Sequence, residues 1–599
     1  MKYIHKIVVL LFLSLWLGGC SEDSLDLSPK DELSEATAFV SYSNVKTYAW
    51  NLYYAFPAYD GGSRDDKEHE MKKDVEADLM QNNNISGNNW LMGNVKVPIA
   101  SEFGWQRPYE RIRRVNLMLD NLDASNMTQD EKDHWRSVGL FFRAYEYTHL
   151  ISLYGAVPWV GYAITDADTD ILYGPRTPRD EVAANILRDL TWAEAHINEN
   201  GDGPNTVNVH VVRTLISRFG LFEGTWRKYH ALGNHEIYLN ASIAASEELM
   251  VAFPDLHPNY DELYNSESLA DVEGIILYKE YQLDVMHIRM ATDFRSSNSA
   301  WDITRKGIDK FLCKDGQTIY NSLTFDADND RKDKYAEFRN RDKRLLFTTP
   351  PPYKIIGQGA FKWIHTENPA DQEYFAVMEA MSDTLHKTLP DLNWAGKTIK
   401  EIPNLEEAGF NKSKATGYRI WKHYNQLHSG RSSADFADAP IFKMSEVLLN
   451  YAEAKFEMGE FSQTIADQTI NKLRVRGDVA SMQVSQIDAT FDPTSDTDVD
   501  PVLFEIRRER AVELMGEGYR RDDLRRWKKM NYASEVKLGR WINTSDYVKT
   551  YSIQGGGAVG YIKYVHAIPP TFPEYYYLKP LPSDQTVLNS QLEQNPGWE

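Results

Sequence analysis

The stretch GLFFRAYEYTHLISLYG, residues 139–155, is the end of a helical pattern that begins near Gln129. Asp130 and Glu131 lie in the first turn of this pattern, where the helix dipole favours acidic side chains. Gly155 and Pro158 follow its end and are typical helix-terminating residues. We therefore predict a helix over residues 129–154.

Helical periodicity continues on both sides of this helix. Val45, Ala49, Leu52 and Phe56 fall on one stripe, and Pro57 ends that pattern. Further helical segments are predicted over 109–122, 178–199, 206–229, 236–252, 440–476 and 501–516. Their lengths and pairing indicate stacked helix hairpins of the tetratricopeptide kind, although no strict sequence repeat is present. The fold class is therefore mainly α.

Other segments lack helical periodicity. Residues 57–104 are rich in Asn, Gly and charge, which predicts a long irregular loop of the kind that usually carries function. Residues 268–420 are mixed, with β-like runs such as EGIILYKEYQ, and 477–500 and 545–575 are turn-rich. Glycines at 555, 557 and 560 match the spacing of a dinucleotide-binding loop, but β-like residues follow them instead of a helix, so we interpret them as a hairpin turn.

The N-terminus has the pattern of an export signal. Lys2 and Lys6 precede an apolar run over 7–17 that is too short to span a membrane. Gly18-Gly19-Cys20 then resembles the box at which bacterial lipoprotein precursors are cut. We predict a signal peptide over 1–19, acylation of Cys20, and a tether over 20–35. The alternative is an ordinary leader with an accidental cysteine.

Composition excludes several classes of protein. The chain has 599 residues and a net charge of −21, which argues against a nucleic-acid partner because affinity for nucleic acid comes from Lys and Arg contacts to phosphate. The chain contains two cysteines. If Cys20 carries lipid, Cys313 has no disulfide partner, and the fold depends on core burial.

One acidic segment has part of a calcium-loop pattern. Asp326, Asp328 and Asp330 have the spacing of the first three ligands of such a loop, and Glu337 has that of the last. Arg331 stands where the loop requires glycine. The sequence leaves two alternatives, a structural calcium site or a solvated acidic turn.

The segment FEIRRERAVELMGEGYRRDDLRRWKK, residues 504–529, alternates acidic and basic residues. Glu505 with Arg508, and Arg510 with Glu513, lie three positions apart, where helical ion pairs form. We interpret the segment as a structural, salt-bridged helix. No zinc-protease, phosphate-loop or nucleophile-elbow motif occurs, and only a spatial pair of carboxylates for glycoside hydrolysis stays open.

Several stretches along the chain form an ordered set of motifs. They are PYERIRRVNLMLDNL (108–122), FFRAYEYTHLISLYGAVPWV (141–160), LCKDGQTIY (312–320), MSEVLLNYAEAKFEMGEFSQTIADQTINKLRVRG (444–477), EIRRERAVELMGEGYRRDDLRRWK (505–528) and YYLKPLPSDQTVLNSQLEQNPGW (576–598). Together they resemble the SusD/RagB family of outer-membrane nutrient-binding lipoproteins. The resemblance implies an α-helical fold with tetratricopeptide-like helix pairs and an irregular ligand-binding half. It also implies an N-terminal region over 36–320 and a C-terminal region over 321–599 that form one globular unit.

The same resemblance implies a function without catalysis and without a cofactor. The protein would be lipid-anchored in the outer membrane, face the cell exterior, capture oligosaccharides, and deliver them to a TonB-dependent transporter of the SusC kind. Alternatives are a peptide-binding import lipoprotein of the same family, a surface glycoside hydrolase, and a helix-repeat scaffold. A glycan array, a peptide pool and a search for new reducing ends distinguish glycan binding, peptide binding and glycoside hydrolysis from one another.

The family's ligand residues do not transfer by motif, so the site is predicted from chemistry. Pyranose rings pack on aromatic faces, while planar polar groups fix their hydroxyls. Two loops have that composition, and an earlier loop contributes polar groups. The candidates are Trp90 with Asn88 and Asn89, Trp301 with Asp293, Arg295 and Asn298, and then Tyr59, Arg64 and Asp65. The alternative for each tryptophan is a role in packing.

Overall fold

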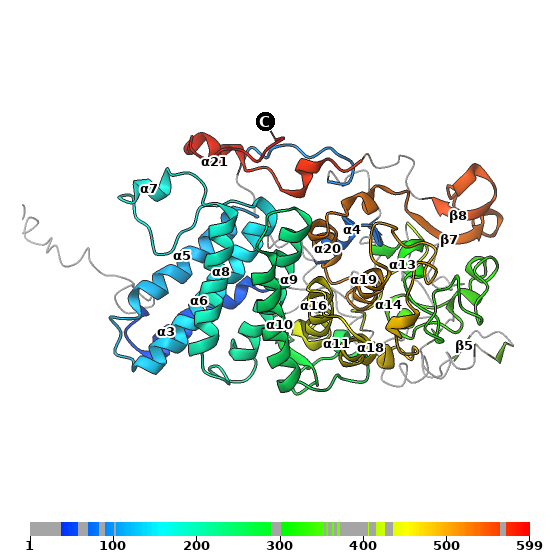
Figure 1. Cartoon of the computed structure of the whole chain (residues 1–599), viewed down its shortest axis with the longest axis horizontal. Coiled ribbons are helices and arrows are strands. Elements are labelled where there is room, and N and C mark those ends of the chain that lie inside the picture. Colours follow the sequence, from blue (N-terminus) through cyan, green and yellow to red (C-terminus); the bar gives the residue numbers. More distant parts are fainter. Residues whose placement is uncertain are drawn as a thin grey trace, which may run out of the picture.

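The computed structural model describes residues 38–57, 70–82, 90–100, 104–283, 285–286, 288, 301–352, 355–356, 362–363, 368–369, 371, 405, 415–425, 435–563 and 571–598. Figure 1 shows the N-terminal helices gathered at one end of an elongated molecule and the hairpin formed by residues 538–563 at the other end. Among the described residues, no helix combines the length and the apolar composition that are needed to cross a bilayer.

Helix α6 (Gln129–Tyr154) has the bounds that the sequence predicts. Thr128 and Glu131 form a capping box, in which each side chain accepts a hydrogen bond from the other residue's backbone N–H, at 3.4 and 2.8 Å. Gly155 follows with φ of 74°, a conformation that glycine adopts without strain. Local sequence therefore fixes both ends of the longest element of the helical end.

The helices of this end pack in chain order, each against the next (Figure 1). They are α5 (Gln106–Asn121), α6, α8 (Arg179–His196), α9 (Val209–Tyr229), α10 (His235–Ala252) and α16 (Met444–Glu457). At Gly220 an added Cβ would lie 2.5 Å from the carbonyl oxygen of Tyr238, so α9 and α10 approach closely only because residue 220 is glycine. The predicted stacking of helix hairpins is confirmed.

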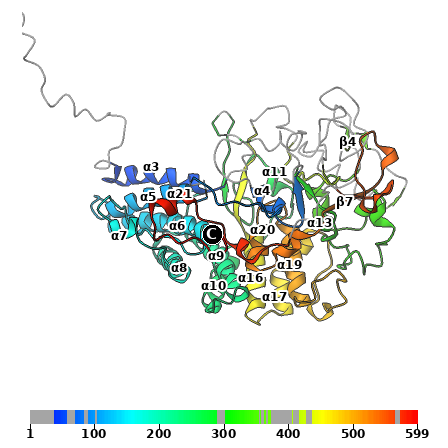
Figure 2. The ribbon, with the colours of Figure 1, turned by 90° about the horizontal axis from the view of Figure 1, so that it is seen from above.

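The first described helix is α3 (Tyr42–Trp50), followed by a 3₁₀ turn over Asn51–Ala55. The predicted stripe of Val45, Ala49, Leu52 and Phe56 is buried in the largest apolar cluster, which confirms that prediction. Figure 2 shows α3 along an outer edge of the helical end.

The predicted helical segment over 440–476 is wrong at its start and is interrupted. Strand β6 (Ala439–Lys443) precedes α16, and its backbone pairs with β2 (Ile275–Lys279). Gly459, with φ of 76°, follows α16 and separates it from α17 (Gln463–Gln468) and α18 (Ile470–Arg476). Strand pairing across the chain therefore overrides the local helical periodicity.

The sheets among the described residues are two-stranded and antiparallel. Besides β2–β6, the pairs are β1 (Met80–Asn82) with β3 (Trp301–Ile303), β4 (Ile355–Ile356) with β5 (Lys362–Trp363), and β7 (Leu538–Asn543) with β8 (Val559–Lys563). The 3₁₀ turn Gln554–Gly556 lies just before β8, which confirms the hairpin interpretation of the glycine motif.

Shorter helices complete the fold (Figure 1). They are α4 (Glu70–Val75), α7 (Thr169–Leu172), α11 (Glu262–Asn265), α13 (Arg305–Asp309), α14 (Arg344–Thr348), α19 (Pro501–Glu513), α20 (Arg520–Arg526) and α21 (Ser583–Leu588). Helix α4 and strand β1 lie in the segment 57–104, so the prediction of a wholly irregular loop is wrong over residues 70–82.

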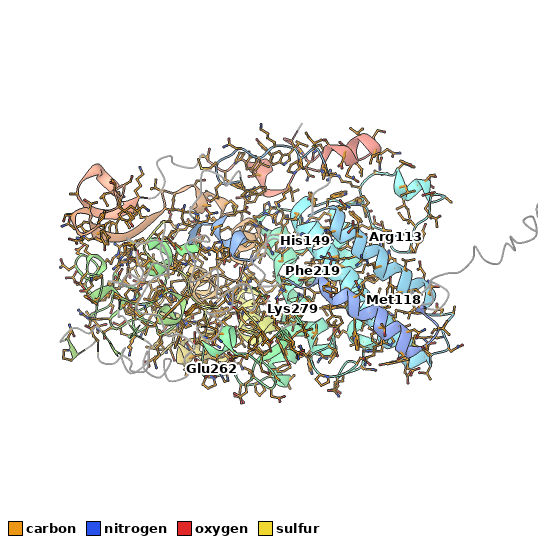
Figure 3. All side chains as sticks on the ribbon, turned by 180° about the vertical axis from the view of Figure 1, so that it is seen from behind. Arg113, Met118, His149, Phe219, Glu262 and Lys279 are labelled. Atoms are coloured by element: carbon orange, nitrogen blue, oxygen red, sulfur yellow. The ribbon has the colours of Figure 1, made fainter. Side chains whose placement is uncertain are left out.

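The apolar core continues across residue 320. The largest cluster of buried side chains joins residues from Ala38 to Leu592, and the second joins residues from Val75 to Met515. Figure 3 shows the side chains filling the molecule from end to end, with Phe219 and Met118 among the helices. Both halves of the chain therefore contribute to the same core, while the boundary at 320/321 stays a prediction.

The charged segment 504–529 is two helices, α19 and α20, and its ion pairs are buried. Arg508 donates to Glu505 at 2.8 Å, as predicted. The predicted Arg510–Glu513 pair is wrong: Arg510 pairs with Asp523 at 2.9 Å, and Glu513 accepts from Arg344 at 3.0 Å. Burial makes these groups seek partners on other elements, because a charge in the core requires a counterion that closes its hydrogen bonds.

Candidate functional site

The β1–β3 ladder brings together the attachment points of two predicted ligand loops. Met80 pairs with Ile303 and Asn82 pairs with Trp301, in antiparallel register. The end of β1 therefore lies beside the beginning of β3. Segment 83–89 leaves from Asn82, and segment 289–300 arrives at Trp301, so both are attached to the same end of the ladder.

The segment that carries β1 is held by α20. The Asp74 carboxylate accepts hydrogen bonds from the backbone N–H groups of Gly516 at 2.8 Å, Gly518 at 3.1 Å and Arg520 at 3.0 Å. Asp78 accepts two more from the Arg520 guanidinium, at 2.8 and 3.0 Å. A carboxylate at a helix N-terminus is favoured by the helix dipole. The position of β1 is thus set by residues more than 400 positions away.

Strand β3 is fixed from its other side. The buried Asp302 carboxylate accepts from the backbone N–H groups of Ala415 and Thr416, each at 3.0 Å. Thr304 donates its N–H to the carbonyl of Leu79 at 2.8 Å. Trp301 is only partly buried and packs against the second apolar cluster. The ladder therefore supports Trp301 on a rigid base beside Asn82.

Trp90 is packed among aromatic residues of the C-terminal segment. Its indole is 7% exposed, and its ring lies 5.6 Å from that of Tyr576 and 5.7 Å from that of Phe572. Tyr576 in turn stacks on Trp598 at 4.8 Å. This placement favours the packing alternative for Trp90 over a ligand platform, so Trp301 is the stronger aromatic candidate.

The remaining predicted ligand residues lie outside the described residues. They are Tyr59, Arg64, Asp65, Asn88, Asn89, Asp293, Arg295 and Asn298. Cys20, the predicted lipidation site, lies outside them as well.

The acidic turn at 326–330 uses its carboxylates within itself. Asp326 accepts from the side-chain amide of Asn329 at 2.7 Å and from the N–H of Asp328 at 3.0 Å. Asp330 accepts from the N–H of Asp326 at 2.8 Å. Within the described part of the chain, no group of three or more His, Cys, Asp or Glu side chains could hold a metal ion. This geometry fits the solvated-turn alternative better than a calcium loop.

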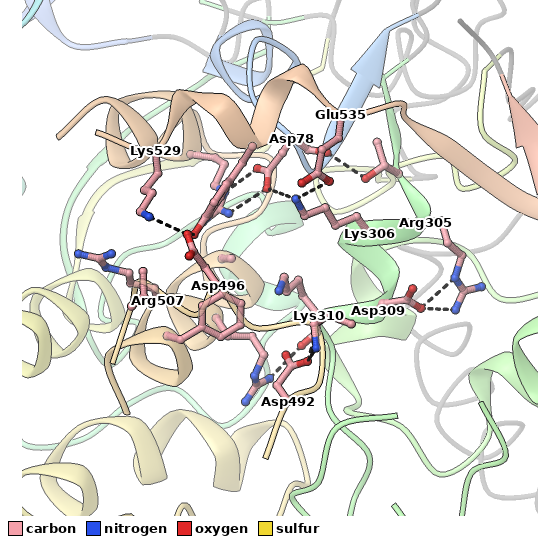
Figure 4. A pocket seen from close by; sticks show the side chains of 18 of the residues that line it. Asp78, Arg305, Lys306, Asp309, Lys310, Asp492, Asp496, Arg507, Lys529 and Glu535 are labelled. Carbon is pink, nitrogen blue, oxygen red and sulfur yellow. Dashed lines mark hydrogen bonds and ion pairs between the residues drawn. The ribbon is translucent and has the colours of Figure 1, made fainter. Parts of the chain in front are cut away.

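A charged pocket of about 600 Å³ lies between α13, residues 492–499, α19, α20 and residues 529–538 (Figure 4). Several of its acidic groups are paired with cations. Asp496 pairs with Lys529 at 2.7 Å, and Asp309 pairs with Arg331 at 2.7 Å. Lys306 lies 2.9 Å from Glu535 and 3.4 Å from Asp78. Sequence reasoning missed this pocket because its lining comes from segments far apart in the chain.

The aromatic faces in this pocket are covered by the protein's own cations. Lys306 lies 5.0 Å from the ring centroid of Tyr532, and Arg507 lies 4.4 Å from that of Trp527. Cation–π contacts of this kind occupy the ring faces that a sugar would need. The pocket therefore differs from a stacking site for a pyranose.

Two of its carboxyl groups are unsuited to donate a proton. Burial alone would raise the pKa of Asp78, but the charges of Arg520, Lys306 and Lys310 and the hydrogen bonds from Arg520 together outweigh burial and hold this pKa below its ordinary value. Arg305, Arg331 and Arg341 together lower the pKa of Asp309 in the same way. Burial also lowers the pKa of Lys310 to about 8 and that of Lys537 to about 7. A general acid for glycoside hydrolysis needs a raised carboxyl pKa, which neither Asp78 nor Asp309 has.

The stacked helix pairs, the small β-ladders and the loop-bearing end define a helical scaffold of the tetratricopeptide-like class. Residues 278–598 match the SusD family, and residues 23–219 match a family described as starch-binding associating with outer membrane. The chain belongs to the SusD family, as its sequence motifs predict.

Two curated relatives come from Formosa agariphila. SusD-like protein P2 is 31% identical over 107 residues, which is 18% of this chain and 21% of that protein. SusD-like protein P25 is 25% identical over 206 residues, or 32% of this chain and 38% of that protein. The chain thus spans well under half the length of either relative in these alignments.

Solved structures share the fold over almost the whole chain. A SusD-like carbohydrate-binding protein from Bacteroides fragilis has a TM-score of 0.68 at 18% identity, covering 93% of this chain and 100% of its own. A laminarin-binding SusD-like protein has a TM-score of 0.52 at 16% identity, covering 93% and 98%. These likenesses confirm the mainly α, SusD-like fold.

Proposed function

We propose that this protein is a cell-surface lipoprotein that binds oligosaccharides and passes them to a TonB-dependent transporter of the SusC kind. The observation that carries the proposal is the pair of family matches, which extend over most of the chain and include a family described as starch-binding. The printed names of two fold neighbours, carbohydrate binding and laminarin binding, support the same class of ligand.

The binding site in this proposal is the end of the β1–β3 ladder. Trp301 supplies the aromatic face, and the attached segments 83–89 and 289–300 supply Asn88, Asn89, Asp293, Arg295 and Asn298. A sugar site needs such a pairing of an apolar face with planar hydrogen-bonding groups. Anchoring of Trp301 on a base held by Asp302 fits the preformed character of ligand sites.

The protein acts in this proposal without catalysis. Support comes from the charged pocket, where Asp78 and Asp309 are ion-paired and have lowered pKa values instead of the raised value of a general acid. Among the described residues, the carboxyl group with a raised pKa is that of Asp438, at about 6; it is 3% exposed and accepts from the backbone N–H groups of Tyr281 and Leu269. That arrangement is structural.

Isothermal titration tests the ligand and the site together. Maltoheptaose and laminarin oligosaccharides are titrated into the wild-type protein, the Trp301→Ala variant and the Trp90→Ala variant. We expect binding of at least one glycan, a loss of about tenfold or more in affinity for Trp301→Ala, and a smaller change for Trp90→Ala. Losing one stacked ring removes about 1–3 kcal/mol, judged from buried aromatic area. Undiminished affinity in a folded Trp301→Ala protein would eliminate this site.

Two further measurements separate the alternatives. A peptide pool that binds where the glycans do not would replace the glycan proposal by peptide import. New reducing ends after incubation with the same oligosaccharides would show hydrolysis. Lipid attachment is tested by labelled palmitate, which we expect the wild-type chain to incorporate and the Cys20→Ala variant to lack.

A further inference from the structure

The first described helix presents two aromatic side chains to solvent. Trp50, at the end of α3, is 55% exposed, and Tyr54 in the following 3₁₀ turn is 61% exposed. They are four positions apart, and neither belongs to the buried stripe of Val45, Ala49 and Leu52. Among the tryptophans whose side chains the structure describes, Trp50 is the most exposed. Figure 2 shows α3 at the edge of the molecule.

Basic side chains flank these two rings. The Lys46 ammonium lies 5.4 Å from the Trp50 ring centroid and 2.6 Å from Asp202. Arg114 of α5 donates to the side chain of Asn51, between Trp50 and Tyr54, at 3.1 Å. Large exposed rings beside Lys and Arg are characteristic of the boundary between lipid and water, where the rings reach the headgroups and the cations meet phosphate.

This face also lies at the point where the chain comes from its predicted anchor. The roughly 18 residues between Cys20 and Ala38 span at most about 60 Å when fully extended. Helix α3 follows directly, so of the described helices it is the first along the chain from the lipid. A surface that is tethered close to the membrane has a high effective concentration there, so that even contacts of low intrinsic affinity are populated.

We propose that the face formed by Trp50, Tyr54, Lys46 and Arg114 rests in the headgroup layer of the outer membrane. The inference rests on the proposed lipid anchor at Cys20. A lipid surface suits this face better than a sugar does, because the rings stand on the outside of a helix, whereas ligand sites are concave. The contact sets which side of the protein faces the bilayer. It therefore also sets the orientation of the β1–β3 ladder relative to the membrane.

Brominated lipids test this contact, because bromine quenches only tryptophans that lie close to the acyl chains. The full lipidated chain is reconstituted into phosphatidylcholine–phosphatidylglycerol vesicles with and without brominated acyl chains. The variants are Trp50→Phe and, as a matched control, Trp192→Phe on α8, whose ring is partly buried against the core. We expect wild-type emission to be quenched, Trp50→Phe to lose at least about half of that quenching, and Trp192→Phe to keep it.

Each contrary outcome has a distinct meaning. If the wild-type chain floats with the vesicles but Trp50→Phe is quenched as strongly as wild type, this inference is overturned while the lipid anchor stands. If the wild-type chain fails to float, the anchor fails, and the inference fails with it. If maltoheptaose changes wild-type emission but not that of Trp50→Phe, the face is a sugar platform, and the membrane contact is again overturned.

Discussion

Replacing Glu453 by Gln tests the energetic role of the buried ion pairs. Glu453 is fully buried on α16 and accepts from both Arg526 Nη atoms, at 2.8 and 2.6 Å, and from the Trp527 indole at 2.5 Å. Burial alone would raise its pKa, but the charges of Arg526 and its neighbours lower it to about 2, against an ordinary value of 4.5.

The difference between the folded-state pKa of Glu453 and its ordinary value contributes to the free energy of unfolding. At about 1.4 kcal/mol for each tenfold change in proton affinity, it corresponds to about 3 kcal/mol in favour of the folded state at neutral pH. Because the folded-state pKa is the lower one, the stabilisation is complete above pH 4.5 and is lost as the pH falls toward about 2. Glu453→Gln should therefore lower the free energy of unfolding by about 3–5 kcal/mol at neutral pH, since it also removes one of the two carboxylates that pair with the buried Arg526.

Urea unfolding followed by tryptophan fluorescence measures this effect. We expect the difference between wild type and Glu453→Gln to shrink as the pH is lowered from about 5 to about 3, because only the wild type loses this carboxylate. The matched control is Glu248→Gln, whose side chain is 61% exposed and lies 3.4 Å from Arg213, and which should cost less than about 0.5 kcal/mol. A Glu453→Gln protein within about 0.5 kcal/mol of wild type at neutral pH would refute the reasoning.

Three other predictions concern single contacts. Asp74→Ala removes the acceptor of three backbone N–H groups at α20 and should destabilise the protein by about 3 kcal/mol in the same urea assay. Asp74→Asn should recover part of this stability, because its amide oxygen still accepts. An equal loss of stability in both variants would contradict an acceptor role for Asp74. Gly220→Ala should lower the free energy of unfolding by about 2 kcal/mol or more and lower the thermal midpoint, because the added Cβ would clash with the carbonyl oxygen of Tyr238. An unchanged thermal midpoint would show that α9 and α10 can move apart without loss of stability. Calcium should leave the thermal midpoint of the wild-type protein unchanged, because the Asp326 carboxylate is engaged within its own turn. If calcium instead raised the thermal midpoint of the wild type but not that of Asp326→Ala, the calcium-site alternative would be correct.

Local signals in the sequence predict much of the helical end. Thr128 and Glu131 at the start of α6, and Gly155 at its end, act within one or two turns, so the predicted bounds are correct. The stripe beginning at Val45 likewise reports burial directly. The prediction over 440–476 is wrong at residues 440–443, because β6 forms through its pairing with β2, more than 150 positions earlier.

The candidate site depends on contacts that no local signal carries. Asn82 and Trp301 are neighbours through strand pairing, and Trp90 meets Tyr576 through packing of the C-terminal segment. Composition identified aromatic residues suited to sugars but could not separate the packed indole of Trp90 from the partly buried one of Trp301. The preference of Arg510 for Asp523 over Glu513 has the same origin, because tertiary burial chooses the counterion.

The hydrogen bonds that hold Asp74 depend on residues that are synthesised late. Its partners Gly516 and Gly518 are made long after it, 442 and 444 positions later. A nascent chain that lacks residues 516–520 therefore lacks this support for β1. If the protein binds its ligand as we propose, binding requires the C-terminal part of the chain, and proteolytic removal of residues 500–599 should abolish it without cutting the ladder itself.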